Sequence, residues 1–259
     1  MKHKVIFIHG MFQNATSWDS WVDYFTEKGY DCLAESWPLH VGDPKQLREN
    51  PPLGLGDLRL QEVIDQFAGL VSIVDPEAIL IGHSVGGLIV QAILNKGLGS
   101  MGVCISSAAP NKMLAFDWGF FKNSLSIVNP LKGDEPFWMT PEIFHQSFCN
   151  TMTREESDEA YERTAVHDSR QVFRDCLMEA GELDLDQTNR PLFFISGEND
   201  EIIPAELNKK NAKAYKNGLA EFAQFPNRGH FICGQPGWRA VAETADRWVN
   251  RQYIHTVQV

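Results

Sequence analysis

The sequence predicts an α/β fold in which a mostly parallel sheet of about six strands carries helices on both faces. Short apolar runs alternate with amphipathic helical patterns up to residue 110 and again from residue 190, which favours parallel strands joined by crossover helices. Between residues 111 and 189 no convincing strand pattern is present, which indicates a helical insertion. A Gly-x-Ser-x-Gly spacing centred on Ser84 also joins a predicted strand to a predicted helix.

Local patterns predict each element of the first part of the chain. Val5–Ile8 is wholly apolar, as expected for a strand buried on both faces. Ser17 is the expected N-cap of the next helix, and the proline and glycine residues over 37–56 predict a loop. The expected elements are a strand over 5–8, a helix over 17–28, a strand over 32–35, a helix over 57–74, a strand over 79–81, a helix over 88–96 and a strand over 102–106.

The second part of the chain carries helix-start signals before the sheet resumes. Three helices are expected in the insertion, with starts at Thr140-Pro141, at the capping box of Thr153 with Glu156, and at Asp168 with Gln171. The sheet then resumes with a strand over 192–195, a helix from Pro204 to about 217, a strand over 221–225 and a last helix from about 236.

The composition fits one large domain with an insertion. The chain has 259 residues, of which 43% are hydrophobic, so an ample core is expected. We divide it into a core, residues 1–110 and 190–259, and a helical cap or lid, residues 111–189. The net charge of −11, from 34 acidic and 23 basic side chains, argues against nucleic acid as a partner.

The termini and the cysteines bear on where the protein works. Met1–Lys4 is basic, but the apolar run that follows is too short for a signal peptide and predicts a strand instead. No run is long enough to span a bilayer, so stable membrane insertion is not expected. The five cysteines form no Cys-x-x-Cys pair, which predicts reduced core residues in a cytoplasmic protein.

Ser84 is the candidate nucleophile because its neighbours predict a sharp strand-to-helix turn. Glycine is needed at positions 82 and 86, since a side chain there would collide with the adjoining strand or helix. A hydroxyl is a weak nucleophile at neutral pH, so Ser84 needs a neighbouring base. That base in turn needs a third group that selects its tautomer.

Asp200 and His230 are the candidate partners of Ser84. Each follows a predicted strand, as Ser84 does, and the strands of a parallel sheet end at one edge. Glu198 and Glu201 flank Asp200 and are the alternatives for the acid.

Four motifs in this order resemble the α/β-hydrolase family, in particular its esterase and lipase group. They are His9-Gly10 after the first strand, Gly82-His83-Ser84-Val85-Gly86-Gly87, Gly197-x-x-Asp200 with Pro204, and Gly229-His230-Phe231. The fragments from Gly10 to Trp18 and from His230 to Trp238 also resemble a bacterial subgroup described as lysophospholipase-like. The chain begins where the full fold has its third strand, so a sheet of about six strands is expected.

The resemblance implies a role for each residue of the triad. Ser84 is the nucleophile, His230 is the general base and later the general acid, and Asp200 orients the imidazole. The spacing from Gly197 favours Asp200 over its two acidic neighbours.

The resemblance also implies an oxyanion hole. Its donors are the backbone N–H groups of Val85 and Met11, and Phe12 is the less favoured donor. His9 is expected to hold this loop, and His83 is expected to pack or hydrogen-bond beneath the turn. No cofactor or metal is expected, since the other histidines show no ligand spacing.

The first half of the insertion is rich in aromatic side chains. They form a small core of the insertion, or they line an apolar pocket above the sheet, and both interpretations stay open. In the second interpretation, Phe12, Trp118 and Trp138 are the expected substrate contacts.

The predicted function is hydrolysis of a small-molecule carboxylic ester with an apolar acyl or alcohol group, through an acyl-enzyme on Ser84. The same triad also serves thioesterases, lactonases, carbon–carbon bond hydrolases, hydroxynitrile lyases and perhydrolases, and these alternatives stay open. The alternative from another class is a ligand-binding protein or receptor on the same fold, against which the intact triad argues. The sequence leaves the oligomeric state open.

Overall fold

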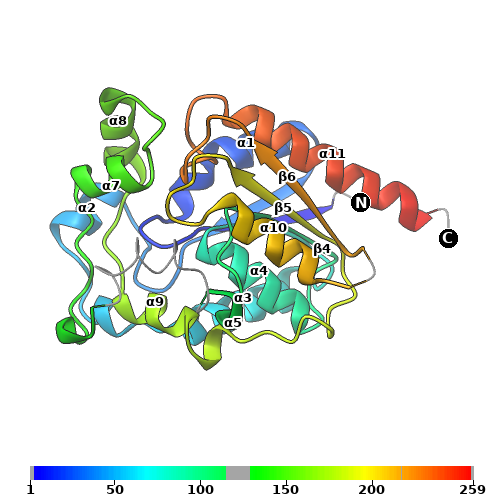
Figure 1. The fold of residues 1–259 in the computed structure, drawn as a ribbon, viewed down its shortest axis with the longest axis horizontal. Helices are drawn as coiled ribbons and strands as arrows, with labels where there is room; N and C mark the ends of the chain where they lie inside the picture. The colour runs from blue at the N-terminus through cyan, green and yellow to red at the C-terminus, as the bar shows by residue number, and fades with distance from the viewer. Residues whose placement is uncertain (1–2, 115–128, 217, 258–259) are drawn as a thin grey trace.

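A computed structural model of the chain describes residues 3–114, 129–216 and 218–257. Its sheet has six strands, all parallel, in the order β2-β1-β3-β4-β5-β6 (Figure 1). The strands are β1 Lys4–Ile8, β2 Asp31–Glu35, β3 Ile79–His83, β4 Met101–Ile105, β5 Leu192–Gly197 and β6 Ala220–Phe225. The predicted α/β architecture with a parallel sheet of about six strands is therefore confirmed.

Helices cover both faces of the sheet because successive strand side chains point to opposite sides. Ile6 and Ile8 pack in one apolar cluster, whereas Val5 and Phe7 pack in the other. The first face carries α3 Leu60–Val74, α4 Val85–Asn95 and α10 Ala205–Ala214 (Figure 1). The second face carries α1 Asp19–Glu27 and α11 Trp238–Val257.

We call the chain between β4 and β5, residues 106–191, the β4–β5 segment. Where the structure describes it, it consists of short helices and 3₁₀ turns joined by loops, with one isolated antiparallel bridge between Phe137 and Asp168. Its elements are α5 Asn111–Leu114, the 3₁₀ turn Pro130–Lys132, α7 Pro141–Ser147, α8 Arg154–Thr164, α9 Arg170–Cys176 and the 3₁₀ turn Glu179–Gly181. The predicted cap at Thr140 and the capping box at Thr153 are confirmed. The cap predicted at Asp168 is wrong, because Ser169 accepts the hydrogen bond from Gln171 N.

Two local predictions in the first part of the chain are also wrong. The stretch predicted as a loop contains α2 Pro44–Glu49 and a 3₁₀ turn, Leu55–Asp57. Asp43 caps α2 by accepting a hydrogen bond from Gln46 N. Pro44 occupies the first position of this helix, where proline is well tolerated, so here a proline begins a helix and does not indicate a loop. Asn14, and not Ser17, caps the 3₁₀ turn Ala15–Trp18 that precedes α1.

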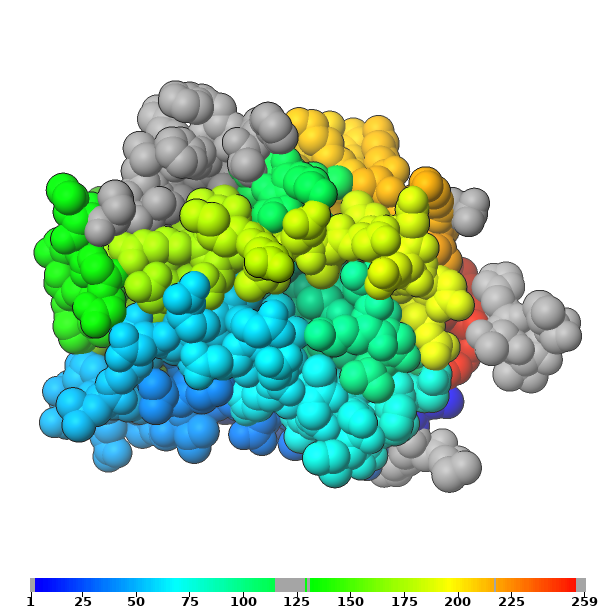
Figure 2. Space-filling model, turned by 90° about the horizontal axis from the view of Figure 1, so that it is seen from below, coloured from blue at the N-terminus to red at the C-terminus, as the bar shows by residue number. Residues whose placement is uncertain are grey.

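The β4–β5 segment is docked on the core by polar contacts. Figure 2 shows the chain around residues 40–60 lying beside the chain around residues 165–185 on one face of the molecule. Arg59 Nε donates to Asp175 Oδ2 at 2.8 Å, and Ser169 Oγ donates to Gly56 O at 2.9 Å. Within the described residues, no helix is both long and apolar enough to cross a membrane.

Candidate active site

Ser84 lies in the turn between β3 and α4, where its backbone adopts a conformation that side chains rarely tolerate. Its φ is 57° and its ψ is −122°. Ser84 N donates to Ile105 O at 2.9 Å, and Ser84 O accepts from Ala108 N at 3.0 Å. The turn is thus hydrogen-bonded to the end of β4 on both sides, which keeps the serine in this strained state.

Three glycines let the surrounding backbone close around this turn. A Cβ on Gly82 would lie 2.2 Å from Gly86 O, and a Cβ on Gly86 would lie 2.2 Å from Ile8 O. A Cβ on Gly10 would lie 2.7 Å from Ser84 Cβ. The collisions predicted from the Gly-x-Ser-x-Gly spacing are therefore present, and the loop after β1 packs directly on Ser84.

His230 and Asp200 lie together at the same edge of the sheet. His230 Nδ1 is 2.8 Å from Asp200 Oδ2, and both side chains are fully buried. The other oxygen of Asp200 accepts hydrogen bonds from the backbone N–H groups of Ile202 and Ile203. The carboxylate is thus held with one oxygen facing the imidazole, whereas Glu198 points elsewhere and accepts from Asn227 N.

The remaining nitrogen of His230 is available for chemistry. His230 Nε2 is buried and makes no hydrogen bond with any described residue, Ser84 Oγ included. Since the Nδ1–H donates to Asp200, Nε2 carries the lone pair of the neutral imidazole. This is the nitrogen that a general base would use. In enzymes, the hydrogen bond between such a base and the nucleophile often forms only when substrate binds.

His83 joins the serine turn to the histidine loop. Its Nε2 donates to His230 O at 2.8 Å, and the centroids of the two rings are 4.8 Å apart. Burial, and then the nearby His230, lower the pKa of His83 to about 3. His83 is therefore a neutral structural residue beneath the turn.

The loop after β1, residues 9–14, which we call the β1 loop, is held by His9. Trp37 N donates to His9 Nε2 at 2.9 Å, so His9 Nδ1 carries the proton and donates to Gly10 O at 2.8 Å. Because the C=O and N–H of a trans peptide point in opposite directions, the N–H of Met11 points away from His9.

Met11 and Val85 leave their backbone donors unused. Neither N–H group makes a hydrogen bond with any other described residue, whereas Phe12 N donates to Asp168 Oδ2 at 2.8 Å. The structure thus leaves the two expected oxyanion donors free and occupies the less favoured one. Asp168 was expected only as a helix start, since no local pattern signals its contact with Phe12.

An aromatic chain leads from the β1 loop to the histidine. The ring centroids of Phe12 and Phe148 are 6.0 Å apart, and those of Phe148 and His230 are 5.0 Å apart. Phe148 is one of the aromatic side chains of the insertion, but it was not among the expected substrate contacts. Trp138 is 43% exposed and packs edge-on against His167, and Trp118 lies outside the described residues.

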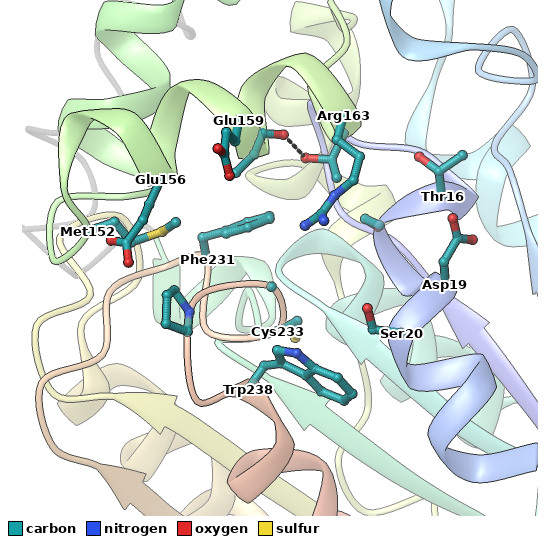
Figure 3. A pocket seen from close by; sticks show the side chains of 15 residues that line it. Thr16, Asp19, Ser20, Met152, Glu156, Glu159, Arg163, Phe231, Cys233 and Trp238 are labelled. Carbon is teal, nitrogen blue, oxygen red and sulfur yellow. Dashed lines mark hydrogen bonds between the residues drawn. The ribbon is translucent and has the colours of Figure 1, made fainter. Parts of the chain in front are cut away.

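A separate cavity of about 290 Å³ lies between α8, the start of α1 and the loop that follows His230 (Figure 3). Its walls combine the rings of Phe231 and Trp238 with the charged side chains of Arg163 and Asp19. Neither Ser84 nor its two partners line it. Among the described residues no three His, Cys, Asp or Glu side chains converge as a metal site would require.

The chain matches the sequence profile of a family described as "Alpha/beta hydrolase family" over residues 5–244. No curated protein matches it significantly.

Solved structures share its fold at low sequence identity. A monoacylglycerol lipase from Paleococcus ferrophilus is 19% identical, with a TM-score of 0.67 and coverage of 93% of this chain and 92% of that chain. A thermophilic esterase from Thermogutta terrifontis is 15% identical, with a TM-score of 0.69 and coverage of 97% and 90%. A putative non-heme bromoperoxidase from Mycobacterium tuberculosis is 19% identical, with a TM-score of 0.71 and coverage of 97% and 93%.

Replacing Gly86 by alanine is expected to destabilise the fold. The new Cβ would push α4 away from β1, at a cost of about 1–3 kcal/mol. The matched control is Gly69→Ala in α3, where nothing lies near the new Cβ and alanine is expected to stabilise the helix by about 0.5–1 kcal/mol. Urea denaturation of both variants measures the difference, and equal shifts would contradict the packing argument.

The free energy of unfolding is expected to decrease as the pH is lowered, because His83 is buried in its neutral form. The unfolded chain takes up a proton near the ordinary pKa of 6.5, whereas the folded protein holds the pKa of His83 at about 3. Its contribution is therefore complete above 6.5 and is lost as the pH falls through this interval. We expect His83→Gln, whose amide N–H can still donate to His230 O, to show a shallower fall in urea stability between about pH 8 and about pH 5. Parallel curves would be the contrary result.

Proposed function

We propose that this chain, which belongs to the α/β-hydrolase family, is a serine hydrolase. It cleaves carboxylic esters through an acyl-enzyme on Ser84. The observation that carries the proposal is the buried His230–Asp200 pair, with His230 Nε2 left unpaired at the sheet edge that also carries the strained Ser84. A ligand-binding protein would not need a buried imidazole nitrogen without a partner at this position, because such a group costs stability.

The first half of the reaction transfers the acyl group to the enzyme. Ser84 Oγ attacks the carbonyl carbon of the ester while His230 Nε2 takes the hydroxyl proton. Asp200 keeps Nδ1 protonated and stabilises the imidazolium that forms. When the tetrahedral intermediate collapses, the alcohol leaves with the proton from Nε2, and the acyl group stays on Ser84.

The second half releases the acid. A water molecule gives a proton to His230 Nε2 and attacks the acyl carbon, and Ser84 Oγ leaves with that proton. In both halves the negative charge develops on the former carbonyl oxygen. The N–H groups of Met11 and Val85 are the proposed donors to this oxygen, supported by their lack of other partners and by the contact of Gly10 with Ser84.

The substrate class follows from the apolar surroundings of His230. Phe148 and Phe12 form an aromatic wall beside the imidazole, which suits an uncharged apolar acyl or alcohol group. We propose that residues 111–189 act as a cap, with Trp118 and Trp138 as further substrate contacts. The names of the structural relatives, a lipase and an esterase among them, support ester hydrolysis over other uses of the same triad.

Hydrolysis of p-nitrophenyl esters from acetate to palmitate tests the proposal directly. We expect the wild type to release p-nitrophenol and Ser84→Ala to lose the activity, because no acyl-enzyme can form. The chain-length profile then reports the size of the acyl site. If the wild type neither hydrolyses any ester nor reacts with a phosphonate at Ser84, the ligand-binding alternative replaces this proposal.

The acid role is tested with Asp200→Asn. The variant is expected to lower kcat by about 10³- to 10⁴-fold, because an amide favours the wrong tautomer of His230. Glu198→Gln is the matched control, since Glu198 accepts only from a loop N–H and is expected to leave kcat within about twofold. A large loss in the control with little loss in Asp200→Asn would move the acid role to a neighbour.

A further inference from the structure

A second buried histidine–carboxylate pair, His40 and Asp168, lies beside the β1 loop. His40 Nε2 is 3.4 Å from Asp168 Oδ2, and the two side chains are 1% and 0% exposed. His40 Nδ1 donates to Pro38 O at 2.8 Å, so a proton on Nε2 would face the carboxylate. None of these groups belongs to the proposed triad.

Asp168 binds the backbone of the β1 loop. Its Oδ2 accepts from Phe12 N at 2.8 Å, and Val166 N donates to Phe12 O at 2.9 Å. Both polar groups of the Phe12 backbone are therefore bonded to the β4–β5 segment. Phe12 has a φ of 64°, a conformation that is costly for a large side chain and that persists only when its surroundings impose it.

Asp168 is itself firmly placed. Its Oδ1 accepts from Ser169 N at 2.7 Å. Its backbone exchanges two hydrogen bonds with Phe137, at 2.7 and 3.2 Å. An opposite charge stabilises a buried carboxylate, and His40 Nε2 lies 3.4 Å from Asp168 Oδ2, although the two atoms form no hydrogen bond.

The charges around His40 agree with an ion pair. Burial alone disfavours its charged form, but the carboxylate of Asp168 and the carbonyl of Pro38 outweigh burial and raise the pKa of His40. His9, whose ring centroid is 5.8 Å away, faces His40 from the β1 loop. Burial, and then the charge on His40, hold the pKa of His9 well below its ordinary value, so His9 stays neutral.

The two peptides that flank Met11 are thus held from opposite sides. His9 holds the peptide between Gly10 and Met11 through its carbonyl, and Asp168 holds the next peptide through the N–H of Phe12. If the second peptide turned over, the carbonyl of Met11 would point to where the N–H of Phe12 now points. The carboxylate forbids this, since it would repel that oxygen.

We propose that Asp168, paired with His40, is a positioning residue for the oxyanion hole, which keeps the N–H of Met11 directed at the reacting carbonyl oxygen. This inference rests on the proposed function of Ser84. Asp168 touches no reacting atom. Because it belongs to the β4–β5 segment, the geometry of the oxyanion hole depends on how this segment docks on the core.

The test compares Asp168→Ala and Asp168→Asn with a matched control, Asp175→Ala. Asp175 is also a buried carboxylate of the β4–β5 segment that binds the core, through Arg59 and Leu60 N, but it does not contact the β1 loop. Removing one oxyanion donor costs about 10²–10³ in kcat, so we expect Asp168→Ala to lower kcat about 10- to 100-fold with KM within about threefold. Asp175→Ala should lose comparable thermal stability with kcat within about threefold.

Two further measurements separate positioning from general damage. The affinity for an alkyl boronic acid, which forms a tetrahedral adduct on serine, should fall in parallel with kcat in Asp168→Ala. Asp168→Asn keeps an oxygen that can accept from Phe12 N but loses the acceptor for Ser169 N and the charge that faces His40, so it should recover part of the loss in kcat. Equal losses of kcat in Asp168→Ala and Asp175→Ala, or no recovery in Asp168→Asn, would overturn the proposal.

Hydrogen exchange of a peptide covering residues 9–14 gives a readout that does not need activity. Exchange should be faster in Asp168→Ala than in the wild type and unchanged in Asp175→Ala, because only Asp168 protects Phe12 N–H. Unchanged exchange in Asp168→Ala would refute the positioning role. If the wild type hydrolyses no ester, the proposed function fails, and exchange alone then decides whether Asp168 fixes the loop.

Discussion

The close packing of helix α4 on strands β1 and β3 is the constraint on which the candidate site depends. There is no room for a Cβ on Gly82 or Gly86, so the chain has to turn from strand to helix within one residue. That residue is Ser84, which takes a φ of 57° as a result. Such a conformation persists only where neighbours impose it, so the packing of the core holds the backbone of Ser84 in place.

Buried imidazoles connect the loops that meet around Ser84. His9, His83 and His40 each donate a ring N–H to a backbone carbonyl, and His230 donates one to Asp200. A buried donor or acceptor without a partner is costly, so each contact fixes a proton on one ring nitrogen and the orientation of the ring. Of these histidines, His230 is the one that donates Nδ1–H to a carboxylate and leaves Nε2 without a hydrogen bond to any described residue, which is the asymmetry that the proposed general base catalysis requires.

The β4–β5 segment completes the site from the other side of the chain. Phe148 O accepts from Phe231 N beside the histidine, and Asn150 Nδ2 donates to Asn199 O beside the acid. Asp168 reaches the β1 loop in the same way. Each of these three loops is therefore held through a backbone atom by a hydrogen bond to this one segment, from its backbone in one case and from its side chains in the other two, so the position of the segment affects the shape of the candidate site.

The parallel sheet, the turn at Ser84 and the approach of His230 to Asp200 could all be predicted from the sequence. These depend on short-range features, namely apolar strands, glycine spacing and the rule that parallel strands end at one edge. The contact between Asp168 and Phe12 N could be seen only in the folded protein, because Asp168 looks locally like a helix start and the two residues are 156 positions apart in the sequence. A single carboxylate meeting a single N–H leaves no periodicity in the chain, so folding alone brings the two together.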